Sequence, residues 1–391
     1  MNGLKLLTNS NLSYWILLLL FALIALVISN ICYEVVSKLN TQSFLDHCSD
    51  LLTSISITFF NNIIATILAI IIAFLITNYL YNKKFFKSSF LIILISFPHI
   101  SYCIGITYLF ATSGFFARLF AFFYGNDIPF ISERGDASSN LIYIISLALR
   151  EVPFLVLIGL SVLKKINALQ IQKQVLVLGH SNLSALLCCI FPIWLKSMTL
   201  PILIIVTFCF SNYEFSSILG PQFPHMINVK IIDSWYSTNF NLAQQMNSLI
   251  IITILSSILA LITLYTLMQI LNGYLKNQKF LGFGNYNLFS LGKIFYFIVI
   301  ALFMIILFIT SLLSISESWF FPTIMPSSFS LRGFDYMVSN YLWLFFSSIF
   351  ISSVISILCL LFVVILIETS KDSKKPVKSS FFCGFYATPI D

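Results

Sequence analysis

Two oppositely charged residues interrupt an otherwise apolar run of the sequence. Arg150 and Glu151 are adjacent within the run 140–163, and Pro153 follows closely. A charged side chain at membrane depth costs about 3 kcal/mol and normally faces protein or a water-filled path. Because neighbours on a helix point in different directions, each charge needs its own partner unless Pro153 bends the helix. We expect the pair either to line a solute path or to tie helices together, and Glu214, at the end of a later apolar run, is a third candidate.

Metal, disulfide and phosphate chemistry have no matching motif in the sequence. The four histidines lie in separate segments with no carboxylate at helical spacing: His47, His99, His180 and His225. The eight cysteines are scattered without a C-x-x-C pair, which is typical of small core residues. Glycines at 282 and 284, before Gly292-Lys293, have the wrong spacing for a phosphate-binding loop. We therefore predict no metal site, no bound cofactor, no enzymatic activity and no ATP hydrolysis by this chain itself.

The composition indicates an integral membrane protein. The chain has 391 residues, of which 59% are hydrophobic and 9% are charged, and its mean hydropathy is +0.97. Soluble domains usually carry about 25% charged residues. The net charge of +7 does not indicate nucleic-acid binding, because the lysines and arginines form short clusters between apolar runs. The lipid bilayer is therefore the first predicted partner, and no nucleic acid is expected.

Eight apolar runs of about 20 residues are long enough to cross a membrane as helices. They are 14–36, 55–80, 89–110, 140–163, 187–210, 246–271, 294–315 and 341–367. The first run is too long for the apolar core of a cleaved signal peptide, so we expect an uncleaved first span. Because backbone polar groups within a bilayer must be satisfied internally, the predicted fold is all-α, a polytopic bundle of about eight transmembrane helices.

The positive charges alternate between the loops. Fourteen lysines lie at the N-terminus and after the second, fourth, sixth and eighth runs: Lys5, Lys83, Lys84, Lys87, Lys164, Lys165, Lys173, Lys276, Lys279, Lys293, Lys371, Lys374, Lys375 and Lys378. The other loops carry five basic residues: Lys38, Arg118, Arg134, Lys230 and Arg332. Basic loops stay in the cytoplasm, so this pattern predicts a multi-pass protein with both termini cytoplasmic.

Two stretches predict irregular backbone. Phe97-Pro98-His99 with Gly105 predicts a kinked third span with a close-packed face. The stretch 219–224, Leu-Gly-Pro-Gln-Phe-Pro, cannot be helical throughout, and it is a turn between spans, a cap over a pathway or a contact for an external partner.

A polar, basic segment at 164–186 lies on the predicted cytoplasmic side. Ile171, Val175 and Leu178 share one helical face and predict an apolar docking stripe. Gly179 is suited to end that helix, and Ser181 or Asn182 to cap the next one. From the residues alone, the segment is either a docking surface or an amphipathic helix lying on the membrane.

The distance from Gly179 to Pro192 resembles the cytoplasmic coupling loop of binding-protein-dependent ABC transporter permeases, E-A-A-x-x-x-G-x(9)-I-x-L-P. The glycine and the proline are matched, whereas Lys173 stands at the glutamate position and Gln174 and Val175 stand at the alanines. Cys189 stands at the isoleucine position. In that family the first arm of the loop lies in a groove of the ATPase subunit. The departures from the E-A-A half put the usual polar contacts in doubt.

Further stretches are similar to the fused double permeases of the ferric iron, thiamine and putrescine importer type. They are 96–98 with 111–114 and Arg118, the element 150–154, and 218–224. Those permeases have two units and two such loops, whereas this chain has one loop. The resemblance divides the chain into a first permease unit, 1–285, and the start of a second unit, 286–391, so the chain looks truncated or split.

The resemblance implies a type I ABC importer permease in a bacterial inner membrane. It would move a small solute from a periplasmic binding protein, and a separate ABC ATPase subunit would bind and hydrolyse ATP. A second permease unit or chain is a further expected partner. The alternative is an ion-coupled secondary transporter that uses Arg150, Glu151 and Glu214 as intramembrane charges.

Overall fold

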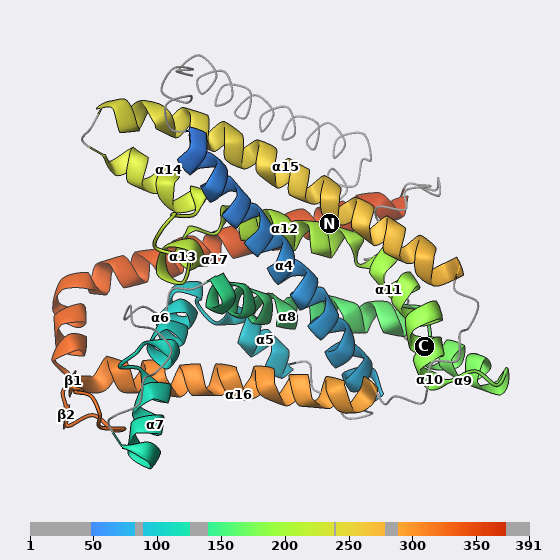
Figure 1. Ribbon diagram of the computed structural model, residues 1–391, viewed down its shortest axis with the longest axis horizontal. Helices are drawn as coiled ribbons and strands as arrows, with labels where there is room; N and C mark the ends of the chain where they lie inside the picture. The colour runs from blue at the N-terminus through green and yellow to red at the C-terminus, as the bar shows by residue number, and fades with distance from the viewer. Residues whose placement is uncertain (1–47, 83–88, 126–139, 238–239, 278–287, 373–391) are drawn as a thin grey trace, which may run out of the picture.

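The computed structural model describes residues 48–82, 89–125, 140–237, 240–277 and 288–372. The predicted span at 14–36, His47, and the lysines at 83–87 and 374–378 lie outside these residues. The described chain is almost entirely helical, with one small two-stranded hairpin. Figure 1 shows long helices crossing a bundle in which shorter helices fill the centre and both ends.

Five long helices form the frame: α4 (Cys48–Tyr81), α8 (Asn140–Lys165), α15 (Phe240–Asn277), α16 (Leu288–Ile315) and α17 (Arg332–Asp372). The shorter helices are α5 (Ser89–Ser96), α6 (His99–Phe110), α7 (Phe115–Tyr124), α9 (Ala168–Val177), α10 (Asn182–Ser184), α11 (Phe191–Ser197), α12 (Thr199–Ser211), α13 (Tyr213–Ile218) and α14 (Ile227–Tyr236). A π-helical turn, η1 (Ala185–Ile190), joins α10 to α11, and β1 (Ser316–Ser318) pairs antiparallel with β2 (Ser328–Phe329).

The described residues confirm an all-α polytopic membrane protein. Six helical stretches are long and apolar enough to cross a membrane: Leu51–Tyr81, His99–Tyr124, Asn140–Lys165, Leu249–Leu275, Leu288–Ile315 and Arg332–Glu368. A seventh crossing is possible through the pair Asn182–Ser197 and Thr199–Ser211, which are bent by 61°. Five of the six stretches each coincide with one predicted span, and the bent pair covers the predicted span 187–210.

The predicted span 89–110 is two helices in the structure. α5 ends at Ser96 and α6 begins at His99, because Pro98 cannot donate the hydrogen bond that would continue α5. The predicted kink is therefore confirmed as a complete break. The apolar stretch long enough to cross begins at His99 and includes α7, which the sequence prediction did not contain.

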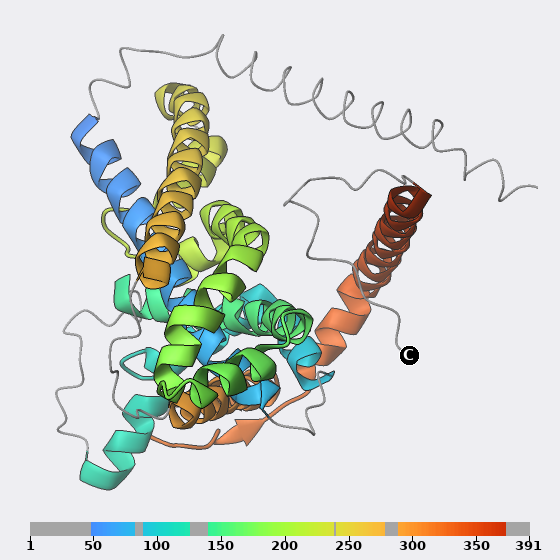
Figure 2. The same ribbon diagram turned by 90° about the vertical axis from the view of Figure 1, so that its right-hand side faces the viewer.

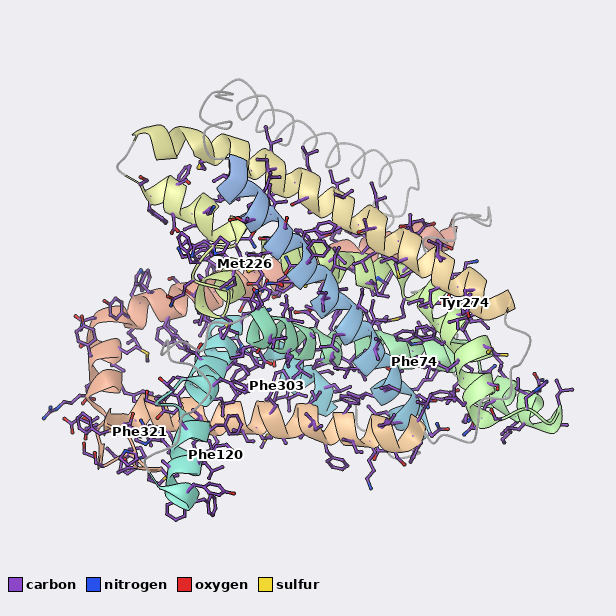
Figure 3. The ribbon with its side chains drawn as sticks, viewed as in Figure 1. Phe74, Phe120, Met226, Tyr274, Phe303 and Phe321 are labelled. Atoms are coloured by element: carbon purple, nitrogen blue, oxygen red, sulfur yellow. The ribbon has the colours of Figure 1, made fainter. Side chains whose placement is uncertain are left out.

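The core lies where α4 and α8 pack side by side, with α11 and α12 against them. Trp194 of α11 is fully buried, and a Cβ at Gly159 of α8 would lie 2.9 Å from its Nε1 atom. On the other side of the bundle, α16 packs on α4 and α6. Figure 3 labels Phe74 of α4 and Phe303 of α16 within this packed region.

Glycines permit the close approach of α16. A Cβ at Gly292 would lie 2.3 Å from the Leu75 carbonyl oxygen, and one at Gly105 would lie 2.5 Å from Ile306 Cγ2. Small residues at such crossings allow helix backbones to pack closely in a membrane. The close-packed face predicted around Gly105 is therefore confirmed, and α16 is part of the same packed body as α4 and α6.

In contrast, α17 has almost no cover from the rest of the described chain. None of the residues in its apolar window is buried. Figure 2 shows α17 leaning away from the bundle, with its C-terminal part well separated from the other helices.

Candidate functional site

Arg150 joins α8 to the break between α5 and α6. Its Nη2 atom donates hydrogen bonds to the carbonyl oxygens of Phe97 at 2.9 Å and Ile95 at 3.1 Å. Carbonyls in the last turn of a helix have no partner within that helix, so the guanidinium supplies donors that the broken span lacks. Arg150 is 4% exposed. Of the two roles expected for it, the tie between helices is the one its contacts form.

Glu151 is buried next to Arg150, but one of its carboxylate oxygens lacks a hydrogen-bond partner in the described part of the chain. The residue is 8% exposed, and its Oε1 atom has no hydrogen-bond partner among the described residues. Arg150 Nε is also buried without a partner there. The helix is continuous through Pro153, and no ion pair joins Arg150 and Glu151 among the described residues. Glu151 Oε1 is thus a buried hydrogen-bond acceptor that no described donor reaches.

A ladder of small polar residues runs along α4, which packs against α8. Ser54, Thr58, Asn62 and Thr66 recur every fourth residue and are all buried. The spacing places them on one face of the helix. Asn62 Oδ1 accepts a hydrogen bond of 2.8 Å from the Tyr143 hydroxyl of α8. At Asn62 the ladder of α4 therefore contacts α8, the helix that carries the charged pair.

The loop after α12 contributes to the same polar region. Thr58 Oγ1 accepts a hydrogen bond of 3.0 Å from the backbone N–H of Ile227, which opens α14. Asn228 Nδ2 donates to the Asn212 carbonyl and to Ser216 Oγ, each at 3.3 Å. Asn212 also caps α13 by accepting a hydrogen bond from Phe215 N at 3.2 Å. We did not predict this network from the sequence. The recurrence of a polar residue at every fourth position of an apolar run is the pattern that could have indicated it.

Glu214 does not complete a triad of charges. It lies in the first turn of α13, beyond the end of α12, and is partly exposed. Within the described residues, no hydrogen bond or ion pair joins it to Arg150 or Glu151. The stretch 219–224 between α13 and α14 is not helical, as predicted.

The segment that contains Gly179 forms a tight helical elbow. The N–H of His180 bonds to the Val175 carbonyl at 3.3 Å, and the N–H of Gly179 to the Leu176 carbonyl at 3.0 Å. This pair of bonds is the Schellman arrangement that ends many helices, and Gly179 takes the left-handed conformation it requires, with φ of 81°. Ser181 Oγ then accepts a bond of 3.2 Å from Ser184 N, so Ser181 is the cap of the next helix.

The predicted docking stripe is only partly available to a partner. Val175 is buried and Ile171 packs on the bundle core, so these two residues attach α9 to its own protein. Leu178 is 72% exposed, and its neighbours Val177 and Leu176 are 87% and 44% exposed. Helical spacing shows which residues share a face but not what covers that face. The exposed apolar surface is therefore the tip at 176–178 rather than the predicted stripe.

Other residues of the segment are placed as follows. Lys173 and Gln174 are exposed on α9. Gln172 Nε2 donates to Asn182 Oδ1, which links the two arms of the elbow across Gly179. A small cleft of about 320 Å³ lies beside this link, lined by Asn78, Asn82, Gln172, Asn182, Leu186 and Phe289.

The first arm of the elbow is α9, and the second arm is the run of α10, η1 and α11. The second arm anchors the elbow in the bundle. Pro192 lies in the first turn of α11, where a missing N–H donor is tolerated. The adjacent Phe191 packs edge-on against Phe74 of α4, with ring centroids 4.7 Å apart. Along α8, Lys165, where the segment containing the elbow begins, is roughly 22 Å from Arg150 at 1.5 Å per residue. The two candidate sites thus lie at different depths of one packed bundle.

No group of three or more metal-ligating side chains converges within the described residues. No protein-family model, curated protein or solved structure matches the chain.

Proposed function

We propose that this chain is the transmembrane permease subunit of an ABC importer in a bacterial inner membrane. In this proposal it moves a small solute, delivered by a periplasmic binding protein, while a separate ABC ATPase subunit hydrolyses ATP. The observation that carries the proposal is the Gly179 elbow, an exposed apolar tip within the lysine-bearing segment 164–186, with both arms packed against the bundle. Lysine-rich loops face the cytoplasm, where such an ATPase would be.

The packing of the elbow supports a mechanical role. Ile171 packs the first arm on the core, where Val175 is also buried, and Phe191 attaches the second arm. Packed interiors are stiff and shift between discrete arrangements, so movement of the tip would be passed to α4 and α8. The bend of 61° between Asn182–Ser197 and Thr199–Ser211 is a natural place for such a change.

The solute path in this proposal runs beside the polar ladder of α4. Polar residues inside a membrane are costly and normally face the bundle interior or a water-filled cavity. Ser54, Thr58, Asn62 and Thr66 lead along α4 towards the depth of Glu151. A second permease unit or chain would cover the exposed surface of α17.

Gly179 gives a clean test because the space around it is open. A Cβ at this position would meet no atom within 4 Å, so a substitution acts through backbone conformation alone. The left-handed region costs a residue with a side chain about 1 to 2 kcal/mol, and valine is especially unsuited to it. We expect Gly179→Val to reduce both the recovery of the ATPase subunit with the chain and ATP-driven uptake.

Two matched variants control for this effect. Asparagine tolerates the left-handed region, so Gly179→Asn should retain both properties. Gly273 of α15 also has open space around it but an ordinary helical backbone, so Gly273→Val should leave both unchanged. Full recovery of the ATPase and full uptake with Gly179→Val would refute the proposal.

An ion-coupled secondary transporter is the second candidate, and one observation favours it. Glu151 Oε1 is buried and has no partner among the described residues, as expected of a carboxylate that binds a transported cation. Uptake that stops with an uncoupler but persists after ATP depletion would favour this candidate over the first.

A further inference from the structure

Arg118 is a buried arginine that neither candidate site uses. It lies on α7, is 3% exposed, and reaches the turn between β1 and β2, about 200 residues later in the chain. Its Nη1 atom donates to the carbonyls of Phe320 at 2.8 Å and Thr323 at 2.7 Å. Its Nη2 atom donates to the Trp319 carbonyl at 3.2 Å. One guanidinium thus holds the turn through three backbone carbonyls.

Aromatic rings enclose the same guanidinium. The Arg118 Cζ atom lies 5.3 Å from the ring centroid of Trp319, 5.8 Å from that of Tyr108 and 6.0 Å from that of Phe321. Its Nε atom donates to the Ser113 carbonyl at 2.9 Å, in the break between α6 and α7. Cation–π contacts and charged hydrogen bonds are strong when they are shielded from water. Arg118 therefore fixes α7 and the β-turn as one unit.

This unit carries a set of exposed, mostly aromatic side chains, which we call the aromatic ledge. It is formed by side chains that are 40% to 77% exposed: Phe120, Phe122, Phe123 and Tyr124 of α7, and Phe320, Phe321 and Met325 of the turn. Figure 3 labels Phe120 of α7 and Phe321 of the turn, and the Arg118 guanidinium of α7 lies 6.0 Å from the Phe321 ring. The opposite face of α7 is buried through Ala117, Arg118 and Ala121, so the helix is amphipathic.

The position of α7 shows that the ledge lies at one end of the spans. Figure 1 shows α7 crossing α16 near its Ile315 end instead of running along it. The ten residues of α7, about 15 Å or half the thickness of the hydrocarbon core, form the last part of the stretch His99–Tyr124. α16 also carries exposed apolar side chains, among them Leu307 and Phe308.

Charge is absent from the exposed part of the ledge. Arg118 is the only charged residue of α7, and its guanidinium is enclosed. Glu317 is the only charged residue of 316–331, and its Oε1 accepts from Arg332 at 3.0 Å. Uncharged aromatic side chains are enriched where membrane spans meet the lipid headgroups, and short amphipathic helices lie in that layer.

We propose that the aromatic ledge rests in the headgroup layer of the bilayer, at the end of the spans opposite the Gly179 elbow, and that Arg118 positions it there. Its occupant is phospholipid. The ledge would hold the outer ends of α6 and α16 at a fixed depth whatever the transported solute is. The proposal rests on membrane insertion and not on the proposed function.

Depth-dependent fluorescence quenching tests the proposal. Phe123→Trp and Phe320→Trp add a fluorophore at exposed positions, and the spectrum of the unsubstituted chain is subtracted. The full chain is reconstituted alone into phosphatidylcholine vesicles carrying bromine at different acyl positions. We expect both tryptophans to be quenched most by bromine near the headgroup. Phe308→Trp, on the lipid-facing side of α16, should be quenched most by deeper bromine.

Two results would contradict the proposed position of the ledge or the role of Arg118. If the Phe123→Trp and Phe320→Trp signals are quenched by aqueous acrylamide but by none of the brominated lipids, the ledge is a water-facing surface suited to another protein, and the proposal is wrong. Adding Arg118→Gln should make the Phe320→Trp signal severalfold more accessible to acrylamide while leaving the Phe308→Trp signal unchanged. No change at 320 would show that Arg118 does not position the ledge.

Discussion

Arg150 donates a hydrogen bond of 2.9 Å to the carbonyl oxygen of Phe97, from the middle of α8 to the break between α5 and α6. The bond joins a buried cation to a backbone group that a broken span leaves without a helical partner. A buried charge is costly in a membrane. Here it donates the hydrogen bonds that the carbonyls at the break before Pro98 would otherwise lack.

Replacing this arginine should destabilise the bundle. Arg150→Leu leaves the Phe97 and Ile95 carbonyls without their donor, and each unpaired buried carbonyl costs about 1 to 3 kcal/mol. We expect a lower midpoint of thermal unfolding in detergent. Arg150→Lys should recover part of the loss, because one ammonium can still donate to a carbonyl. An unchanged midpoint for Arg150→Leu would show that these bonds contribute nothing to stability.

Glu151 should behave differently from its neighbour. Glu151→Gln keeps the shape of the side chain and removes a buried charge whose Oε1 atom has no partner among the described residues. We expect a midpoint of unfolding that is equal or higher. Uptake measured on the same preparation then separates the two functional candidates: retained ATP-driven uptake fits the importer, and abolished uptake fits an ion-coupled transporter.

The contact between α16 and α4 depends on the absence of a side chain at Gly292. A Cβ there would lie 2.3 Å from the Leu75 carbonyl and 2.9 Å from Tyr79 Cβ, so α16 would have to move. We expect Gly292→Ala to destabilise the protein by about 1 to 3 kcal/mol, the usual cost of overpacking. Gly273→Ala, in open space on α15, should instead stabilise it by up to about 1 kcal/mol through helix propensity. Equal effects of the two variants on the unfolding midpoint would contradict this account of the packing.

The sequence predicted those features that depend on local chemistry. Bilayer thickness sets the length of a span, so the apolar runs located α4, α8, α15, α16 and α17. Proline lacks a donor, so Pro98 predicted the break after α5. The conformational freedom of glycine likewise predicted the end of α9 at Gly179.

Features that depend on distant partners were not predictable. Arg118 bonds to carbonyls about 200 residues away, and nothing in its own neighbourhood indicates the turn between β1 and β2. The spacing of Ile171, Val175 and Leu178 gave a shared face, but the bundle covers two of them. Glu214 ends an apolar run, as Glu151 interrupts one, yet the break after Ser211 places it on a separate helix.

In the proposed function, the tip of the elbow meets an ATPase subunit and not the membrane surface. Benzoylphenylalanine in place of Val177, which is 87% exposed, should form a photo-crosslink with whatever covers that tip in native membranes. The same amino acid in place of Phe308 on α16 is the control, and it should form adducts with lipid. We predict that position 177 yields an adduct with a P-loop ATPase subunit, identified by mass spectrometry. Adducts with phospholipid alone at position 177 would contradict the claim and show that α9 is an amphipathic helix lying on the membrane.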